Sequence, residues 1–199
     1  MSLSELIATA PLQEIAATLD GMGDEERVAA TRELGKSSQV ALWEKAASAE
    51  ALTLDFFVPQ DRGRVQEVIH EGRNTLPAFK VFQKRFCRPA DAEDRLFGYN
   101  EGATRGLIGP GFFLAVDSPD PPAGAEGCAI VIDYFRVPQG PVPDAWPAVV
   151  PNEQGLQRWV YAKTRDYMRR VSAHVSIGRA FKNGTKPMPA WFVLCRRDS

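Results

Sequence analysis

Two charged residues lie on strand faces that are otherwise apolar, and they are the strongest indication of chemistry in this sequence. Asp133 alternates with Val131 and Phe135 in one strand-like run. Arg179 alternates with Ile177 in another. A buried charge without a partner is very costly, so each side chain needs an ion-pair partner, a ligand or a route to water. Three arrangements stay open: an Asp133–Arg179 pair, a shared role in orienting a ligand, or a position facing solvent.

A glycine-rich loop over 102–111 follows another candidate strand. Its glycines at 102, 106, 109 and 111 let the backbone approach a ligand closely. The spacing is not that of a dinucleotide-binding loop, and a tight connection between strands is the simpler interpretation. Functional side chains nevertheless concentrate on such loops. The hydrogen-bonding and charged residues at this edge are Tyr99, Asn100, Glu101 and Arg105.

The candidates for a general acid or base are Asp133, Glu101 and His174, because carboxylates and imidazoles are the usual groups for this work. His174 lies at the end of a predicted helix, where a histidine usually has a structural role. The sequence contains no GxSxG nucleophile motif, no HExxH and no CxxC. We therefore expect no metal and no cofactor, and the sequence leaves open whether the protein is an enzyme.

Aromatic residues in the second half of the chain are expected to form a core and to enclose a cavity if the sheet is curved. In that arrangement Arg179 anchors an anionic or carbonyl group, and Asp133 or Tyr99 orients it. The predicted ligand-binding residues are Arg179, Asp133, Tyr99, Asn100, Arg105, Phe113, Phe135 and Trp159.

The composition bounds the class of protein. At 199 residues with 44% hydrophobic residues, the chain is long enough to bury a core without metals or disulfides. No run of 18 apolar residues is present, which predicts no membrane span. Three widely spaced cysteines and the absence of a basic leader favour the cytoplasm.

Charge is unevenly distributed along the chain. Residues 1–60 contain ten acidic and four basic residues, whereas residues 156–199 contain two acidic and ten basic ones. Basic residues alternate with aromatic ones over 158–170, a pattern compatible with nucleic-acid binding. The pI near 6.2 argues against that function. The simpler explanation is that the acidic and basic segments pack together or form solvated faces.

The first 50 residues are predicted to be helical, because Leu12, Ile15 and Leu19 form one apolar stripe. Ser2 and Glu5 have the spacing of a capping box. These helices also offer a surface for a homodimer.

Later segments have the sequence pattern of strands bounded by turn residues. The predicted strands are 95–101, 111–117, 128–137, 175–182 and 190–196. The segment 76–88 is ambiguous: Phe79, Phe82 and Phe86 share one helical face, which slightly favours helix, but the segment also alternates as a strand. A long helix is predicted over 153–174, with Trp159, Thr164 and Tyr167 on its apolar stripe.

Together these elements predict an α+β protein. N-terminal helices over 1–50 precede a domain over 51–199, which holds a curved antiparallel sheet of about five or six strands and the packed helix 153–174. A half-barrel or lipocalin-like cup is the first architecture, and a cone-shaped sheet wrapped on a helix, as in the nuclear-transport-factor-like fold, is the second. No segment carries a motif that identifies a family.

Three functions follow from this architecture. The first is a binding protein for a small, partly apolar molecule that carries an anionic or carbonyl group. The second is a cofactor-independent enzyme in the same cup, such as an isomerase, cyclase or lyase. The third is an interaction or regulatory protein that contacts another chain through its helices. A deep aromatic-lined cavity favours the first two functions, and an exposed apolar patch over 12–43 favours the third.

Overall fold

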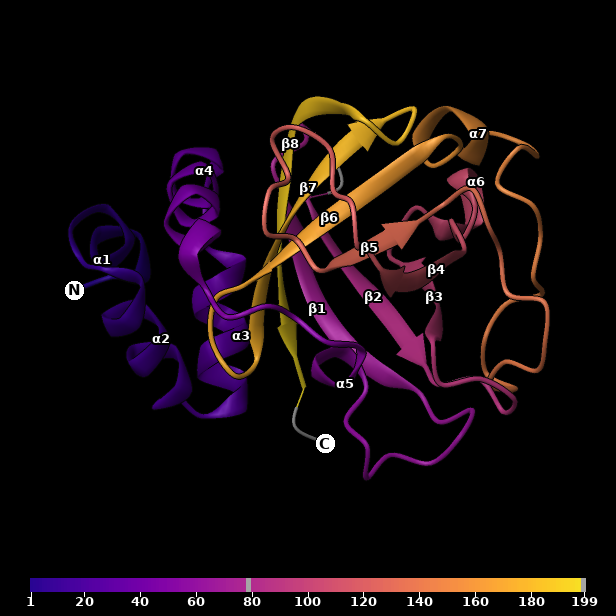
Figure 1. The fold of residues 1–199 in the computed structure, drawn as a ribbon, viewed down its shortest axis with the longest axis horizontal. Helices are drawn as coiled ribbons and strands as arrows, with labels where there is room; N and C mark the ends of the chain where they lie inside the picture. Colours follow the sequence, from indigo (N-terminus) through magenta and orange to yellow (C-terminus); the bar gives the residue numbers. More distant parts are fainter. Residues whose placement is uncertain (78–79, 198–199) are drawn as a thin grey trace.

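The computed structural model describes residues 1–77 and 80–197, and these residues form a closed antiparallel barrel with a group of helices on one side (Figure 1). Each strand pairs with the next one along the chain, and β8 pairs with β1 to close the barrel. The strands are β1 (Val68–Asn74), β2 (Val81–Cys87), β3 (Arg95–Glu101), β4 (Phe113–Asp117), β5 (Ile130–Asp133), β6 (Thr164–Arg170), β7 (Val175–Lys182) and β8 (Lys186–Arg196).

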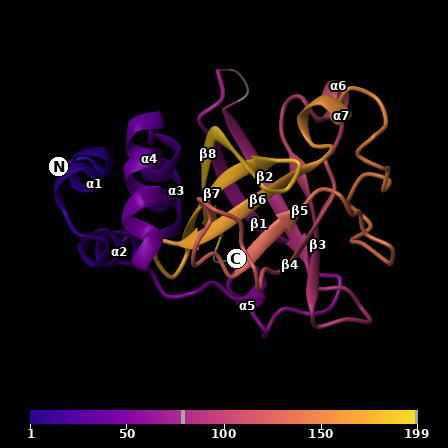
Figure 2. The same ribbon diagram turned by 45° about the horizontal axis from the view of Figure 1, so that its top comes forward.

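The N-terminal helices cover the outer face of the barrel over β1, β7 and β8 (Figures 1 and 2). Their bounds are α1 (Leu3–Thr9), α2 (Leu12–Asp20), α3 (Asp24–Arg32) and α4 (Lys36–Lys45), and the short 3-10 helix η1 (Ala46–Ser48) follows. The predicted capping box at the start of α1 is confirmed, since Ser2 and Glu5 exchange hydrogen bonds. Trp43 of α4 packs with outward-facing Ile177 and Val193 in one buried cluster.

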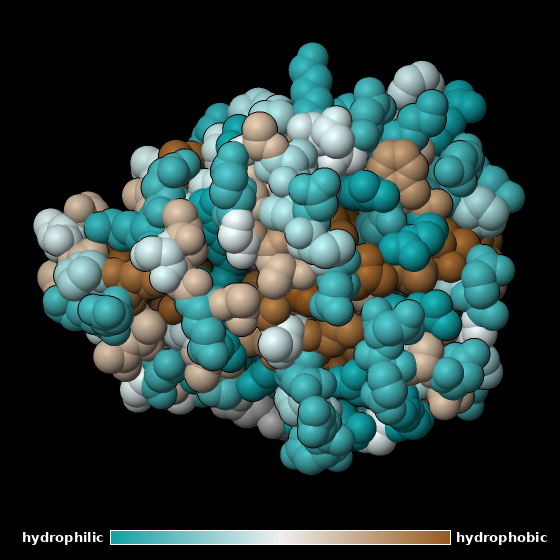
Figure 3. Space-filling view, viewed as in Figure 1, coloured by the Kyte–Doolittle hydropathy of each residue, from teal (hydrophilic) through white to brown (hydrophobic). Residues whose placement is uncertain are grey.

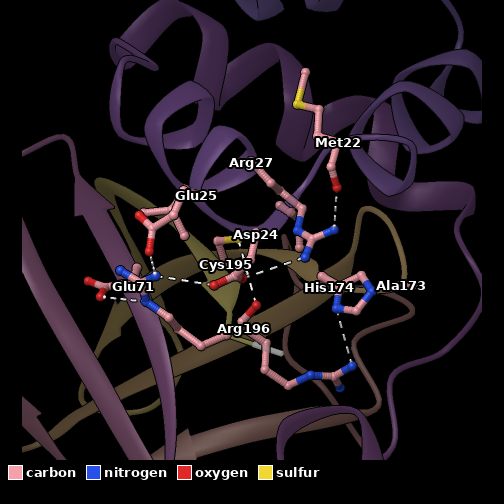
Figure 4. A network of polar contacts seen from close by, with 12 residues as sticks. Met22, Asp24, Glu25, Arg27, Glu71, Ala173, His174, Cys195 and Arg196 are labelled. Carbon is pink, nitrogen blue, oxygen red and sulfur yellow. Dashed lines mark hydrogen bonds and ion pairs between the residues drawn. The ribbon is translucent and has the colours of Figure 1, made fainter. Parts of the chain in front are cut away.

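Ion pairs also hold the helices against the barrel (Figure 4). The buried Glu71 of β1 accepts hydrogen bonds from Arg32 of α3 at 2.6 Å and from Arg197 at 3.2 Å. Arg197 in turn contacts Asp24, at 3.1 Å, and Glu25 at the start of α3. The acidic N-terminal segment and basic C-terminal segment are therefore joined, which supports the simpler explanation of their charges.

The barrel interior is apolar at one end and open at the other. The short helix α5 (Leu54–Phe57) fills one end, where Phe57 packs against Phe86 at 5.1 Å between ring centroids. The short helices α6 (Arg105–Ile108) and α7 (Gln157–Val160) lie together at the opposite end (Figures 1 and 2). On the face shown in Figure 3, apolar residues appear as a band among mostly hydrophilic ones.

Three strand glycines make room for aromatic rings inside the barrel. Gly72 lies opposite Phe82, Gly98 opposite Phe113 and Gly178 opposite Phe192. A Cβ atom at these glycines would lie 2.7, 2.2 and 2.2 Å, respectively, from an atom of the ring opposite. The glycines are therefore required by close packing, and they determine where the rings lie.

The predicted long helix over 153–174 is wrong. All of this range is described, and its helix is limited to α7, after which Lys163 adopts φ of 58° and β6 begins at Thr164. Along β6, Asp166 faces the interior, whereas Tyr167 packs in the outer cluster. The apolar residues of this segment fit the period of 3.6 of a helix as well as the period of 2 of a strand, because β6 is buried on both faces.

The helix favoured for 76–88 is also wrong, since Val81–Cys87 forms β2. Phe82 and Phe86 point inward as alternate residues of that strand. Phe79 lies outside the described residues. Two strands absent from the expected set, β1 and β6, join β2 to complete the barrel.

The expected order of elements, helices before an antiparallel sheet, is confirmed, and the closed barrel fits a lipocalin-like cup. The runner-up, a sheet wrapped on a long helix, does not match the short helices of the described chain. None of the described helices has the length and apolarity needed to cross a membrane. The division of the chain at residue 50 stays a prediction.

Candidate functional site

The open end of the barrel contains a cavity of about 480 Å³. Its walls come from β2, β3, β6, β7 and β8, and α6 and α7 form part of its mouth. The volume lies within the range of roughly 300–1,000 Å³ that is usual for small-molecule sites. Most of its lining is apolar or aromatic, including Phe82, Tyr161 and Phe192.

A cluster of polar side chains lies on the cavity wall around the ammonium group of Lys84. Its Nζ donates to Asn100 Oδ1 at 3.0 Å, to Asp166 Oδ2 at 3.2 Å and to the Tyr134 hydroxyl. The amide nitrogen of Asn100 donates to the same hydroxyl at 3.1 Å and to the Gly111 carbonyl at 2.9 Å. These four side chains, Lys84, Asn100, Tyr134 and Asp166, are called the Lys84 cluster below.

Aromatic rings surround the same ammonium group. Its Nζ lies 5.0 Å from the ring centroids of Phe113 and Tyr134, 4.9 Å from that of Phe192 and 5.7 Å from that of Phe82. Ring faces attract a cation within about 6 Å, more strongly when water is excluded. The side chain of Lys84 is 2% exposed, so the cation depends on these rings and on its hydrogen bonds instead of water.

Burial changes the proton affinities of the Lys84 cluster. Desolvation lowers the pKa of Lys84, although Asp166 opposes this effect. Desolvation also raises the pKa of Asp166 and that of Tyr134, which lies well above its ordinary value. The two shifts bring the pKa of Lys84 and the pKa of Asp166 closer together. Proton transfer from the ammonium group to the carboxylate is therefore easier than between the same groups in water.

The mouth of the cavity combines one ion pair with exposed apolar side chains. Arg105 donates to Glu101 at 2.9 Å, and that carboxylate also accepts the Gly102 N–H at 2.9 Å. Trp159 and Val160 of α7 are 71% and 42% exposed. An apolar molecule therefore meets an apolar rim before it reaches the polar cluster.

Several of the residues predicted from the sequence lie at this cavity. Asn100 belongs to the Lys84 cluster, while Glu101, Arg105 and Trp159 line the mouth. Phe113 lies beneath the Lys84 ammonium group in the barrel core. The glycine-rich loop therefore lies beside a cavity, as expected if its backbone approaches a ligand.

Asp133 and Arg179 share the outer face of the barrel, and the ion pair between them, one of the three arrangements left open by the sequence, does not form. Asp133 accepts from Arg136 at 3.0 Å and from Arg165 at 3.4 Å. Arg179 stacks on Trp191 at 4.9 Å and lines a separate cleft of about 360 Å³ between the helices and the barrel. Any ligand held by either residue would lie outside the barrel cavity.

Other predicted residues also lie away from the cavity. Tyr99 faces outward, packs on Trp146 and donates from its hydroxyl to Glu101 at 3.2 Å. Phe135 is 43% exposed on the outer surface below Arg165. His174 lies in the β6–β7 turn at 3.4 Å from Arg196, near the opposite end of the barrel.

Sequence reasoning missed Lys84, Tyr134 and Asp166. The missed signal was the one used for Asp133: Lys84 alternates with Phe82 and Phe86 as a charge on an apolar strand face. This signal has less weight because the helical spacing of Phe79, Phe82 and Phe86 slightly favours a helix over the ambiguous segment 76–88. Asp166 was hidden in the same way by the predicted helix 153–174.

The arrangement provides hydrogen-bond donors, an acceptor and an amine at the wall of an apolar cavity. Such groups suit a carbonyl, hydroxyl or carboxylate on a mainly apolar molecule. Among the described residues, no group of three or more His, Cys, Asp or Glu side chains is placed to hold a metal ion. Comparison of the chain with protein-family models, with curated proteins and with solved structures gives no match.

Proposed function

We propose that the protein binds a small, partly apolar molecule in its barrel, with a carbonyl group directed at the Lys84 cluster. The observation that carries this proposal is the position of that cluster, buried on the wall of an open and mainly apolar cavity. The apolar body of the ligand would contact Phe82, Tyr161 and Phe192. Its polar end would accept a hydrogen bond from Lys84 or Tyr134.

The balance of charge favours a neutral carbonyl over a full anion. Lys84 already has a carboxylate partner in Asp166, so the pair brings no net charge to the cavity. A ligand carboxylate at that depth would meet Asp166 without a second cation beside it, and an unpaired buried charge is costly. Arg105 at the mouth is already paired with Glu101.

The specificity is testable with ligands that share one apolar body. Benzylideneacetone has a carbonyl, cinnamyl alcohol a hydroxyl, cinnamate a carboxylate and propenylbenzene no polar group. We expect the ketone to bind the purified protein most tightly in equilibrium dialysis, by about tenfold over propenylbenzene, because one buried hydrogen bond contributes roughly 0.5–1.5 kcal/mol and more when it is charged. Equal binding of all four would contradict a role for the polar cluster.

The location of binding is testable with a cavity-filling variant. Ala180 lies on the cavity wall, so Ala180→Phe should weaken ketone binding by about tenfold or more. Ala123→Phe adds the same ring at an exposed loop position and should leave binding unchanged. Circular dichroism and thermal unfolding report whether each variant is folded. Equal affinities in the two folded variants would exclude the barrel as the site.

An enzyme is the second candidate, favoured by the raised pKa values of Asp166 and Tyr134 at the cavity wall. Asp166 would remove a proton next to the carbonyl, and Lys84 or Tyr134 would stabilise the resulting enolate. Protein-dependent deuterium exchange of the benzylideneacetone methyl group in D₂O, followed by NMR, tests this activity. Exchange that persists at the same rate in Asp166→Asn would exclude Asp166 as the base.

An interaction protein that uses the N-terminal helices gains less support. The large exposed apolar side chains of the described residues lie outside 12–43, and several of them surround the barrel mouth. The apolar residues of those helices pack instead against one another and against the barrel.

A further inference from the structure

The buried amine of Lys84 has a chemical capacity beyond hydrogen bonding. The sequence contains seven lysines. Among the described residues, Lys84 is the lysine that lines the barrel cavity. It is 2% exposed, whereas Lys186 lies on the surface. A desolvated lysine loses its proton more readily, and the neutral amine is the nucleophile that attacks carbonyl carbon.

The neighbours of Lys84 match the needs of imine chemistry. Asp166 Oδ2 lies 3.2 Å from the nitrogen, where it takes a proton from the ammonium group and later faces a positively charged iminium. The Tyr134 hydroxyl contacts the same nitrogen and is placed to protonate the oxygen of a bound carbonyl. The rings of Phe113 and Phe192 exclude water from the amine and attract the iminium charge.

We propose that Lys84 captures an aldehyde or ketone as a Schiff base, with Asp166 as the counter-ion. This inference rests on the proposed function, because the carbonyl compound must first enter the barrel. It names the substrate class of that cavity as reactive carbonyl compounds with an apolar body.

The reaction balances without an oxidant or reductant. The lone pair of neutral Nζ forms a bond to the carbonyl carbon, and the C=O π electrons move to oxygen, which takes a proton from Tyr134. Nitrogen then gives a proton back to the Tyr134 phenolate, which restores the hydroxyl and leaves a neutral carbinolamine. The nitrogen lone pair forms the C=N bond as the carbon–oxygen bond breaks, and oxygen leaves as water with the proton that Asp166 took from the ammonium group. Ammonium and carbonyl therefore give a protonated imine and water, and the Asp166 carboxylate is its counter-ion.

The test uses cinnamaldehyde with cyanoborohydride, which reduces an imine to a stable amine. Peptide mapping by mass spectrometry should find one adduct per chain at Lys84, formed about tenfold faster or more than at exposed Lys186. An excess of cinnamyl alcohol, which has the same body but no carbonyl, should protect Lys84 and leave Lys186 labelling unchanged. This competition uses the wild-type protein and does not depend on the folding of a variant.

Two pairs of variants sharpen the assignment. Lys84→Arg keeps a cation beside Asp166 but forms no imine, so the cavity adduct should be lost, whereas Lys186→Arg should retain it. Asp166→Asn should slow trapping at Lys84 by about tenfold, because it removes the proton acceptor and the counter-ion. An unchanged rate in folded Asp166→Asn would overturn the role assigned to Asp166.

Failure of this inference can be separated from failure of the proposed function. If benzylideneacetone binds and Ala180→Phe weakens that binding, but Lys84 stays unlabelled by cinnamaldehyde, the Schiff base is excluded while the cavity remains a binding site. If neither binding nor labelling occurs, both proposals are wrong. Labelling of Lys84 that cinnamyl alcohol does not reduce would show reaction without binding in the cavity, and it would also overturn the inference.

Discussion

Gly98 on β3 lies directly opposite Phe113 on β4, and the Phe113 ring occupies the space in which a side chain at position 98 would begin. The same ring lies 5.0 Å below the ammonium group of Lys84. The absence of a side chain at Gly98 therefore determines where the Phe113 ring lies beside the ammonium group. The glycine links the packing of the barrel to the chemistry of the cavity.

Gly98→Ala should destabilise the protein by about 1–3 kcal/mol or more, because the new Cβ would lie 2.2 Å from the Phe113 ring. The free energy of unfolding in urea measures this loss. Gly106→Ala in α6 is the control: nothing lies within 4 Å of its added Cβ, and we expect no loss but a gain of up to about 1 kcal/mol, because alanine favours a helix more than glycine does. Equal effects of the two substitutions would show that Phe113 moves freely.

Breaking the Lys84–Asp166 pair from one side should cost more than removing it entirely. Lys84→Met and Asp166→Leu each leave one buried charge without its partner, and we expect each to reduce the free energy of unfolding by about 3–5 kcal/mol. The double variant should lose clearly less than the sum of the two. Urea unfolding of all four proteins completes the cycle, and additive losses would mean that the two groups do not interact.

His70 should make stability depend on pH. Its ring is fully buried, Nε2 bonds the Phe57 carbonyl at 2.9 Å, and desolvation lowers its pKa from 6.5 to about 3. The folded state therefore favours neutral histidine, so this stability is fully present above pH 6.5 and is lost as pH falls from 6.5 towards 3. The loss approaches about 1.4 kcal/mol per pH unit within that window.

The pH effect is measured by urea unfolding at several pH values between about 6.5 and 5, above the ordinary pKa values of about 3.9 for Asp and 4.3 for Glu. His70→Gln has no imidazole to protonate and should show a shallower decline than the wild type. Parallel pH profiles for the two proteins would show that His70 takes up a proton without unfolding the chain.

Glu71 should hold the helices to the barrel. Glu71→Gln removes the carboxylate that Arg32 and Arg197 share at 2.6 and 3.2 Å, and we expect a loss of about 1–3 kcal/mol with faster amide hydrogen exchange in α3. Glu50→Gln removes the partner of Arg170, but Glu50 is 79% exposed, so it should change stability by less than about 0.5 kcal/mol. Unchanged exchange in α3 would refute the role of Glu71.

The sequence by itself determined the order of helices and sheet, the capping box at Ser2, and several strands, including the exact span 175–182. It also placed Asp133 with Val131, and Arg179 with Ile177, on common strand faces, because side chains alternate regardless of the rest of the fold. What it left undetermined was which of the two faces lies inside.

Only the tertiary structure decided that question. The N-terminal helices cover the outer face of the barrel, so both faces of β6, β7 and β8 are apolar and alternation does not distinguish inside from outside. The same double burial gave 153–174 the periodicity of a helix. Barrel closure then brought Lys84 to Asp166, 82 residues apart in the chain, and no local pattern records a contact between side chains on strands so distant in sequence.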